Sequence, residues 1–452
     1  MMNLISRLPS WLINCLPVPT ARQCVITQCV QTPADSLSSV EGHGHKRQLL
    51  VDVSVLHQND ARTGIQRVVR ALLLQLFREP LAGCVVCPVF ATRRLGYHHA
   101  SQDFMRAFGH PSQTVSSAGK SVNVQHGDIF LGLDLAAHLL HRHQAQLFNW
   151  KKSGVKVHVV VYDLLPLQHP KWFNPKTTRH FKRWVRWLAI YADTAVCISQ
   201  TVKKELSTWL NASLGLPIGA LPASTIILGA DIEASAPSAG LPSKAEFLLA
   251  RMRSTSAVLM VGTLEPRKGY DQAIAAFEQL WQQPSQTPML VIVGRPGWKT
   301  KALQQQLRTH PQANKRLIWL EDVSDEFLTK LYAACCGVLV ASRAEGFGLP
   351  LIEAALHGKQ ALARDIPVFK ELQIAGLSFF DSNTPQGLAN AITTWQKSLS
   401  DINRTGPRFP TWELSATQLL NELDIHREQT ASRAANIVHK STPILKSTES
   451  AV

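Results

Sequence analysis

Two glutamates, Glu345 and Glu353, lie on either side of a turn that contains two glycines. The apolar run 337–341 before the turn predicts a buried strand, since parallel strands covered on both faces lose polar alternation. Pro350 suits the first position of a helix, so the free amides of that helix start should lie near the turn. An anion site with two carboxylates fits a nucleotide sugar. An ordinary strand-to-helix connection with solvated glutamates is the alternative.

A second group of candidate residues is the adjacent pair Arg267 and Lys268, in a loop after another predicted strand. Together they could neutralise a diphosphate and stabilise the charge that develops as it leaves. Alone, the loop could equally be a surface turn with two solvated cations. Two more polar loops, 294–298 and 321–324, also follow strands of this half. Because open parallel sheets bind ligands at the carboxyl ends of their strands, the four loops together favour a ligand site.

The elements that would position these residues alternate between strand and helix. From residue 258 onward the alternation repeats four times, which predicts a parallel sheet with helices on both faces. Earlier strand patterns near 49–53, 129–133, 157–162, 193–199 and 226–231 predict a second sheet. We therefore predict an α/β fold with two Rossmann-like domains. The predicted boundaries are a poorly ordered extension at 1–47, domains at 48–235 and 236–410, a crossover helix at 411–426 and a disordered tail at 427–452.

The overall charge indicates an anionic partner. The 452 residues carry a net charge of +15, which suits a membrane face, a nucleotide, a phosphorylated acceptor or a nucleic acid. A basic, tryptophan-bearing helix at 177–191 could lie on anionic lipid or pack in the core with a solvated face. The sequence has no apolar run long enough to span a bilayer and no convincing secretory segment. We expect a cytoplasmic protein, with contact to the cytoplasmic membrane face left open.

These motifs resemble the donor domain of family 4 glycosyltransferases, retaining enzymes of GT-B fold. The resemblance covers roughly residues 49–425 and is strongest from 258 to 372. Glu345 and Glu353 match the family's Glu-x7-Glu signature, which implies that Glu345 contacts the sugar hydroxyls and Glu353 the ribose. It also implies a C-terminal donor domain, an N-terminal acceptor domain and a C-terminal helix that returns to the first domain. The turn amides implied to touch sugar and phosphate belong to Gly346, Phe347, Gly348 and Leu349.

The first domain resembles mannosyl- or rhamnosyltransferases of polysaccharide assembly through the segments 63–70 and 162–166. Many family members have a histidine where Tyr162 stands, so that catalytic contact cannot be carried over. His169 is nearby, but a loop histidine packed against Pro170 is the simpler reading. The remaining expected site residues are Asp163, Arg267 and Lys268 as catalytic groups, Gly262, Thr263 and Arg295 at the donor, and Thr63 and Gly64 in a loop for acceptor or diphosphate.

We therefore expect a hexosyltransferase, with mannose from GDP-mannose as the best guess. Its acceptor would be a glycan or lipid-linked sugar of a cell-surface polysaccharide such as lipopolysaccharide. The resemblance implies retention, and we expect front-face substitution without a metal or other cofactor, since no Asp-x-Asp pair occurs in the chain. A sugar-nucleotide epimerase or phosphorylase on the same frame is one alternative. A basic nucleic-acid-binding protein is another, although the cations are scattered without interleaved aromatic residues.

Overall fold

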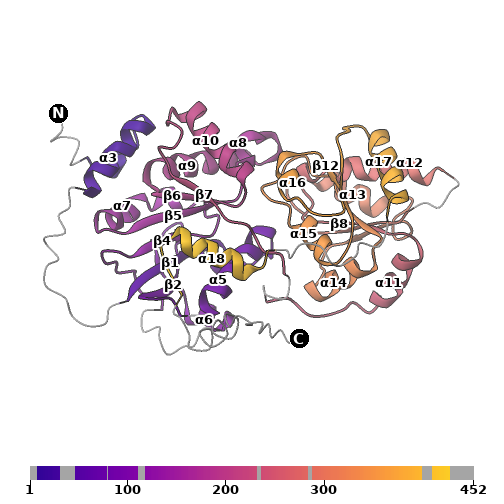
Figure 1. The fold of residues 1–452 in the computed structure, drawn as a ribbon, viewed down its shortest axis with the longest axis horizontal. Helices are drawn as coiled ribbons and strands as arrows, with labels where there is room; N and C mark the ends of the chain where they lie inside the picture. Colours follow the sequence, from indigo (N-terminus) through magenta and orange to yellow (C-terminus); the bar gives the residue numbers. More distant parts are fainter. Residues whose placement is uncertain are drawn as a thin grey trace, which may run out of the picture.

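The structure is a computed structural model that describes residues 8–30, 46–78, 80–109, 118–231, 236–283, 288–399 and 410–427. Within these ranges two sheets form two lobes (Figure 1). The N-terminal sheet has the order β3-β2-β1-β4-β5-β6-β7 and is parallel except for the antiparallel pairing of β3 with β2. The C-terminal sheet has the order β10-β9-β8-β11-β12-β13, and every pairing in it is parallel. The prediction of two parallel-sheet domains is confirmed.

The strands are short and mostly buried, as expected when helices cover both faces of a sheet. In the N-terminal lobe they are β1 Arg47–Asp52, β2 Cys84–Phe90, β3 His98–His99, β4 Ile129–Gly132, β5 Lys156–Val161, β6 Thr194–Cys197 and β7 Ala223–Thr225. In the C-terminal lobe they are β8 Val258–Val261, β9 Leu290–Val293, β10 Leu317–Leu320, β11 Gly337–Val340, β12 Ala361–Arg364 and β13 Leu377–Phe380.

Helices connect the strands. The N-terminal lobe contains α2 Ser10–Ile13, α3 Val18–Val30, α4 Ser54–Gln58, α5 Gly64–Arg78, α6 Gln102–Ala107, η3 Leu140–Arg142, α7 Gln144–Lys152, α8 Leu165–Gln168, η4 Pro170–Trp172, α9 Pro175–Tyr191 and α10 Gln200–Leu214. The C-terminal lobe contains α11 Ala245–Ser254, η6 Pro266–Lys268, α12 Tyr270–Trp281, α13 Lys301–Thr309, α14 Asp325–Ala334, α15 Leu349–Leu356, α16 Pro367–Glu371 and α17 Pro385–Lys397. The last described helix is α18, Trp412–Glu422.

The strand order places the predicted site at one position in the C-terminal sheet. The chain leaves β8 toward β9 and β10, then returns to β11 on the other side of β8, so the order reverses between β8 and β11. Open α/β sheets bind ligands at such a reversal, outside the carboxyl ends of the strands. The loop with Arg267 and Lys268 follows β8, and the turn with Glu345 follows β11. The topology therefore brings the two groups of candidate residues together.

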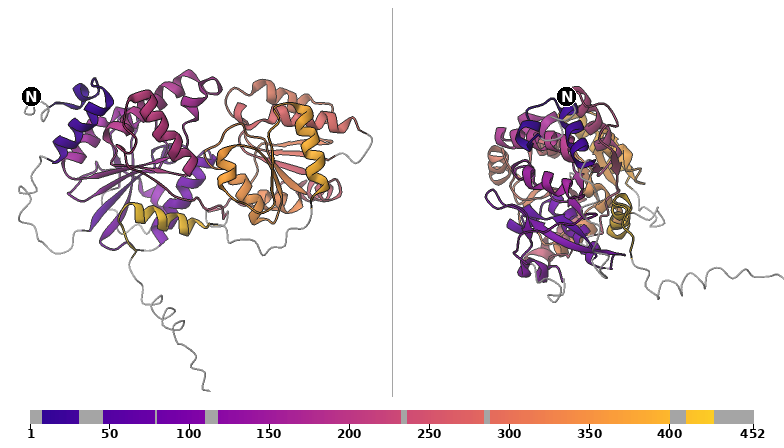
Figure 2. Two further views of the ribbon diagram at one scale, coloured as in Figure 1. Left: turned by 45° about the horizontal axis from the view of Figure 1, so that its top comes forward. Right: turned by 90° about the vertical axis from the view of Figure 1, so that its left-hand side faces the viewer.

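The C-terminal helix α18 returns to the N-terminal lobe, as Figures 1 and 2 show. It packs against α5, and Trp412 at its start is fully buried in the N-terminal core. Its start is held by the segment after β7: Asp231 Oδ1 accepts from Trp412 N at 2.9 Å, and Gly229 N donates to Ser415 Oγ at 2.8 Å. The predicted strand at 226–231 is wrong, because β7 ends at Thr225 and these residues hold α18 instead.

The N-terminal extension contradicts the prediction of poor order at residues 8–30. Helices α2 and α3 pack on α7 and α9, and their apolar side chains join the N-terminal core. Pattern analysis missed α3 because its apolar residues do not gather on one face. Arg22 of α3 is buried and donates to the backbone oxygens of Ala189, Ala192 and Ala220 at 2.8–3.0 Å. Residues 1–7 and 31–45, and the predicted tail from 428 on, lie outside the described residues.

Helix α9 packs into the core rather than presenting its tryptophans to lipid. Trp184 and Trp187 are buried, and Arg186 donates to the carbonyls of Asn14 and Leu16 at the end of α2. The core alternative of the sequence analysis is therefore confirmed for the apolar face of this helix. Lys176, Arg179, Lys182 and Arg183 of this helix are exposed.

We predict that Arg22→Met lowers the free energy of unfolding by roughly 2–4 kcal/mol, because three buried carbonyl oxygens lose a charged donor. The measurement is urea unfolding followed by circular dichroism. Gln23→Met is the matched control, since the neighbouring Gln23 is exposed on the same helix. Equal stability of the two variants would show that α3 contributes nothing to the fold through Arg22.

Candidate active site

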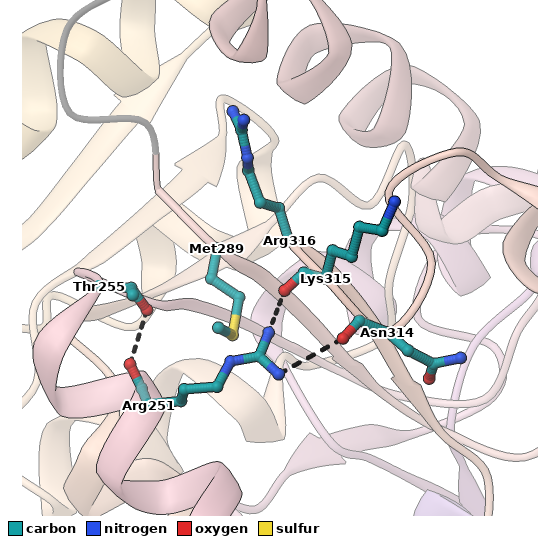
Figure 3. A pocket seen from close by; sticks show the side chains of 6 residues that line it. All are labelled: Arg251, Thr255, Met289, Asn314, Lys315 and Arg316. Carbon is teal, nitrogen blue, oxygen red and sulfur yellow. Dashed lines mark hydrogen bonds between the residues drawn. The ribbon is translucent and has the colours of Figure 1, made fainter.

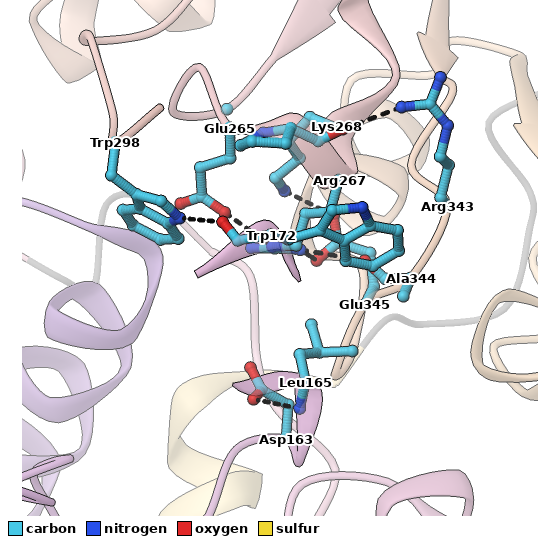
Figure 4. A network of polar contacts seen from close by, with 12 residues as sticks. Asp163, Leu165, Trp172, Glu265, Arg267, Lys268, Trp298, Arg343, Ala344 and Glu345 are labelled. Atoms are coloured by element: carbon cyan, nitrogen blue, oxygen red, sulfur yellow. Dashed lines mark hydrogen bonds and ion pairs between the residues drawn. The ribbon is translucent and has the colours of Figure 1, made fainter. Parts of the chain in front are cut away.

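An ion network lies at the carboxyl ends of β8 and β11 (Figure 4). Arg267 sits between two carboxylates: its Nε donates to Glu265 Oε2 at 2.7 Å, and its Nη1 donates to Glu345 Oε2 at 2.5 Å. Lys268 Nζ donates to the other oxygen of Glu345, also at 2.5 Å. The four side chains are 8% to 15% exposed. The structure thus joins three predicted residues and adds Glu265.

The electrostatics of the network fix its ionisation states. Burial alone would raise the pKa of Glu345, but the charges of Arg267 and Lys268 outweigh it and lower that pKa to about 2. Burial would lower the pKa of Arg267, yet Glu345 and Glu265 raise it well above the usual range. Glu345 is therefore an anion at any physiological pH. It can accept hydrogen bonds from hydroxyl groups, but it cannot supply a proton.

Asp163, from the loop after β5, belongs to the same electrostatic environment. Burial raises its pKa to about 6, although the charge of Arg267 acts in the opposite direction. Its Oδ1 accepts from Leu165 N at 3.1 Å, which orients the carboxylate at the start of α8. Figure 4 shows Asp163 on the opposite side of the network from Lys268. An aspartate with this pKa changes charge just below neutral pH.

The two lobes meet closely at Gly346. A Cβ at this position would lie 2.0 Å from the carbonyl oxygen of Tyr162, so a side chain would push the lobes apart. Ser199 Oγ donates to Gly346 O at 3.0 Å from the N-terminal lobe. Gly348 has φ +119°, a conformation that favours glycine, and α15 begins at the next residue. Pro350 is therefore the second helical residue, one later than predicted.

Glu353, the second carboxylate of the predicted signature, lies in a different network. Its side chain is 3% exposed. Tyr332 Oη donates to its Oε2 at 2.6 Å, and Arg67 of the N-terminal lobe pairs with its Oε1. Arg67 also donates to Asp325 Oδ1 at 2.8 Å. The two predicted glutamates thus belong to separate networks: Glu345 pairs with Arg267 and Lys268, and Glu353 pairs with Arg67.

Several predicted donor residues lie along the same strand edge. Gly262 accepts from Tyr270 Oη at 2.5 Å through its carbonyl, and Thr263 follows it in the loop. Arg295 pairs with Asp322 at 2.8 Å and donates to Ala61 O of the other lobe at 3.2 Å. Arg295 thus has partners in the 321–324 loop and in the other lobe.

Two side chains of the turn are packed in the core, whereas the predicted first-domain loop is exposed. The Phe347 side chain is buried in the N-terminal core cluster, and Leu349 packs against that cluster. Only the backbone amides of this turn remain as candidate ligand groups. Thr63 and Gly64 are exposed at the start of α5, and Thr63 Oγ1 accepts from Gln66 N at 3.3 Å.

Tyr162 and His169 have structural partners. Tyr162 Oη donates to Leu133 O at 2.7 Å inside the N-terminal lobe, so it cannot replace the histidine that many family members have there. The His169 ring stacks on Trp172 with ring centroids 4.1 Å apart. Trp172 O in turn accepts from Trp298 Nε1 at 2.8 Å across the lobes (Figure 4). These residues hold the lobes together beside the site.

A cavity of about 450 Å³ lies elsewhere, at the amino ends of β9 and β10 (Figure 3). Its lining is basic, but Arg251 already donates to the carbonyls of Asn314 and Lys315. In the described ranges, no three histidine, cysteine or acidic side chains form a metal-binding group. Among the same residues, no helix combines the length and apolar character needed to cross a membrane.

Sequence reasoning missed Glu265, Arg67, Tyr332 and Asp325. Glu265 directly precedes the loop proline and could have been found as a carboxylate beside a cation pair. Arg67 lies within the first-domain segment that carried the resemblance, but its partner is 286 positions away. No local pattern indicates such a pairing, because it depends on how the two lobes face each other.

Comparisons with known proteins agree on one family. The family "Glycosyl transferases group 1" matches residues 252–405. The serotype-specific mannosyltransferase WbdA of Escherichia coli is 39% identical over 422 residues, which cover 89% of this chain and 51% of WbdA. O-antigen chain mannosyltransferase B of the same species is 26% identical over 169 residues, covering 36% of this chain and 44% of the relative. The chain spans about half the length of the curated relatives it matches.

Solved structures show the same fold at low identity. Anabaena HepE in complex with UDP and glucose aligns with a TM-score of 0.54 and 18% identity, covering 87% of this chain and 98% of HepE. Sucrose-phosphate synthase of Thermosynechococcus elongatus aligns with a TM-score of 0.51 and 15% identity, covering 87% and 99%. Two parallel sheets facing one another, with the last helix on the first lobe, form the GT-B arrangement. Residues 252–405 therefore form a domain of the group 1 glycosyl transferases, and the chain has the GT-B fold.

Proposed function

We propose that this chain is a retaining mannosyltransferase that transfers mannose from GDP-mannose to a glycan or lipid-linked acceptor of a cell-surface polysaccharide. The observation that carries the proposal is the pairing of Arg267 and Lys268 with Glu345 at the strand reversal. The 39% identity to a serotype-specific mannosyltransferase supports the choice of mannose. Guanosine as the donor base is an inference from that sugar.

The proposed chemistry uses the charges of the Glu345 network. The donor diphosphate takes Arg267 and Lys268 as partners, and the freed Glu345 carboxylate accepts hydrogen bonds from sugar hydroxyls. The bond between the anomeric carbon and the phosphate oxygen then breaks. The acceptor oxygen attacks from the same face, and its proton passes to the departing phosphate oxygen. Arg267, Lys268 and the amides at the start of α15 stabilise the negative charge on that phosphate.

No metal or other cofactor is assigned a role in this scheme. The two cationic side chains supply the positive charge that a divalent ion would otherwise bring to the diphosphate. Asp163 contributes an ionised carboxylate that accepts a hydrogen bond from a sugar hydroxyl in the cleft. Its raised pKa makes that contribution dependent on pH.

We predict transfer of mannose from GDP-mannose to a mannose-terminated lipid-linked acceptor. Glu345→Gln and Lys268→Met should each reduce the rate at least about a hundredfold, because each removes a charge that acts on the sugar or the leaving diphosphate. Product formation by mass spectrometry is the measurement, and Lys397→Met, an exposed change on α17, is the control.

A thermal-shift comparison of GDP-, UDP- and dTDP-sugars identifies the donor independently, since a bound ligand raises the melting temperature. Near-normal transfer by either site variant contradicts the site. Stabilisation by a UDP- or dTDP-sugar alone contradicts the donor assignment. Tight, salt-sensitive binding of mixed oligonucleotides without any nucleotide-sugar effect favours the nucleic-acid alternative instead.

We predict that the transfer rate rises with pH through about 6. Above that value Asp163 is ionised and accepts the hydroxyl hydrogen bond, whereas below it the carboxyl is protonated and this contribution is lost. Glu345 does not titrate in this window, because its pKa lies near 2. The measurement is kcat between pH 5 and 8. Asp163→Asn should lower the rate and remove the inflection, and a wild-type profile that is flat across the window would rule out this role.

The proposed cytoplasmic location includes a peripheral membrane contact on the outer side of α2 and α9. Trp11 is 64% exposed there, and Arg186 ties the end of α2 to the helix whose outer face carries Lys176, Arg179, Lys182 and Arg183. An exposed tryptophan on α2 and exposed cations on the helix joined to it suit an anionic bilayer surface.

We predict that the protein sediments with phosphatidylglycerol vesicles and that Trp11→Ser combined with Lys182→Gln and Arg183→Gln reduces the bound fraction several-fold. The control carries Lys301→Gln and Lys397→Gln, two exposed changes on the other lobe. Equal binding of both multiple variants, or no binding by the wild type, would exclude this surface.

A further inference from the structure

Arg67 connects α5 of the N-terminal lobe to two carboxylates of the C-terminal lobe. Its Nη1 pairs with Glu353 Oε1, and its Nη2 donates to Asp325 Oδ1 at 2.8 Å. The Arg67 side chain is 23% exposed, whereas that of Glu353 is only 3% exposed. A side chain from the opposite lobe therefore covers the carboxylate that is proposed to bind the ribose.

Both oxygens of Glu353 already have partners. Oε1 pairs with Arg67, and Oε2 accepts from Tyr332 Oη at 2.6 Å. Tyr332 is fully buried in the core of the same lobe and cannot leave without disturbing that core. Arg67 has a long side chain that reaches from the N-terminal lobe to the C-terminal lobe. Of the two partners of Glu353, Arg67 is therefore the one that can move aside when two ribose hydroxyls approach.

We propose that Arg67 is a positioning residue that holds Glu353 until the donor binds and then exchanges with the ribose of the donor nucleotide. This inference rests on the proposed function, because it takes Glu353 as the ribose ligand. The exchange does not strand a charge: Arg67 keeps Asp325 as an ion-pair partner, and Glu353 gains hydroxyl donors in place of the guanidinium. A buried carboxylate left with no donor would be far more costly.

The contact of Arg67 Nη2 with Asp325 extends the network to the segment between the lobes. Asp325 Oδ2 accepts from the backbone N of Ser238 at 2.9 Å and from its Oγ at 2.8 Å. Ser238 lies in the segment that leads from the N-terminal lobe to α11. Glu353 is thus linked, through Arg67 and Asp325, to the segment that contains Ser238.

The test is the affinity of the protein for the nucleoside diphosphate that stabilises the wild type, measured by isothermal titration calorimetry with GDP, UDP and dTDP. Arg67→Met removes both arms and keeps the apolar stem. We expect the Kd to fall about threefold to tenfold. In the wild type, Arg67 pairs with Glu353 in a fraction of the molecules, and this fraction lowers the apparent affinity for the nucleotide. Arg67→Lys should give an intermediate Kd, since one ammonium cannot pair as a fork.

Arg70→Met is the matched control, because Arg70 lies one turn further along α5 and pairs with Asp60 rather than with the other lobe. Its Kd should equal that of the wild type. The kinetics should distinguish the two variants as well. In Arg67→Met the KM for the donor falls together with the Kd, which a purely structural defect would not produce.

An unchanged Kd in a folded Arg67→Met variant overturns the exchange. A higher Kd, which means weaker binding, also overturns the exchange and identifies Arg67 as a ligand of the nucleotide. If Arg67→Met does not fold, Arg67→Lys decides in the same way. Failure of every nucleoside diphosphate to bind the wild type would instead contradict the proposed function itself.

Discussion

Charges removed from water must be paired whether or not a substrate is present, and this constraint shapes the cleft. A buried carboxylate or cation is costly in free energy unless an opposite charge or a hydrogen-bonding group pairs with it. In the structure they pair with one another, Glu345 with Arg267 and Lys268, and Glu353 with Arg67. Under the proposed function, ligand binding is an exchange of partners, in which Glu265 keeps one side of Arg267 paired.

The lobes meet through backbone contacts and capping as well as through ions. Glu371 of the C-terminal lobe accepts from the backbone N–H groups of Gln200 and Thr201, the first residues of α10 in the N-terminal lobe. Gly346 leaves no room for a side chain between the lobes. Glu371 is the last residue of α16, whereas Gly346 lies in the turn after β11, next to Glu345. The lobes are thus joined directly beside the ion network of Glu345.

The sequence predicts what depends on local patterns. The strands around 258–340 and the loops with Arg267 and Glu345 follow from apolar runs, glycines and proline, and the alternation of strand and helix places both loops at one edge. The helices at 10–30 could not be predicted this way, because α3 has no single apolar face and is fixed by the long-range hydrogen bonds of Arg22. The partner of Glu353 depends on the lobe arrangement, which no local spacing encodes. The separate settings of the two signature glutamates became visible only in three dimensions.

The return of α18 to the first lobe has a consequence for biosynthesis. The N-terminal lobe is discontinuous in sequence: α18 covers α5, and the backbone of His426 accepts from Ala82 N at 2.8 Å beside β2. During synthesis from the N-terminus, the ribosome completes the entire C-terminal lobe before it releases the segment that closes the core of the first lobe. Until then the apolar face of α5 that receives Trp412 stays uncovered. The first lobe therefore cannot complete its core until the second lobe has been synthesised.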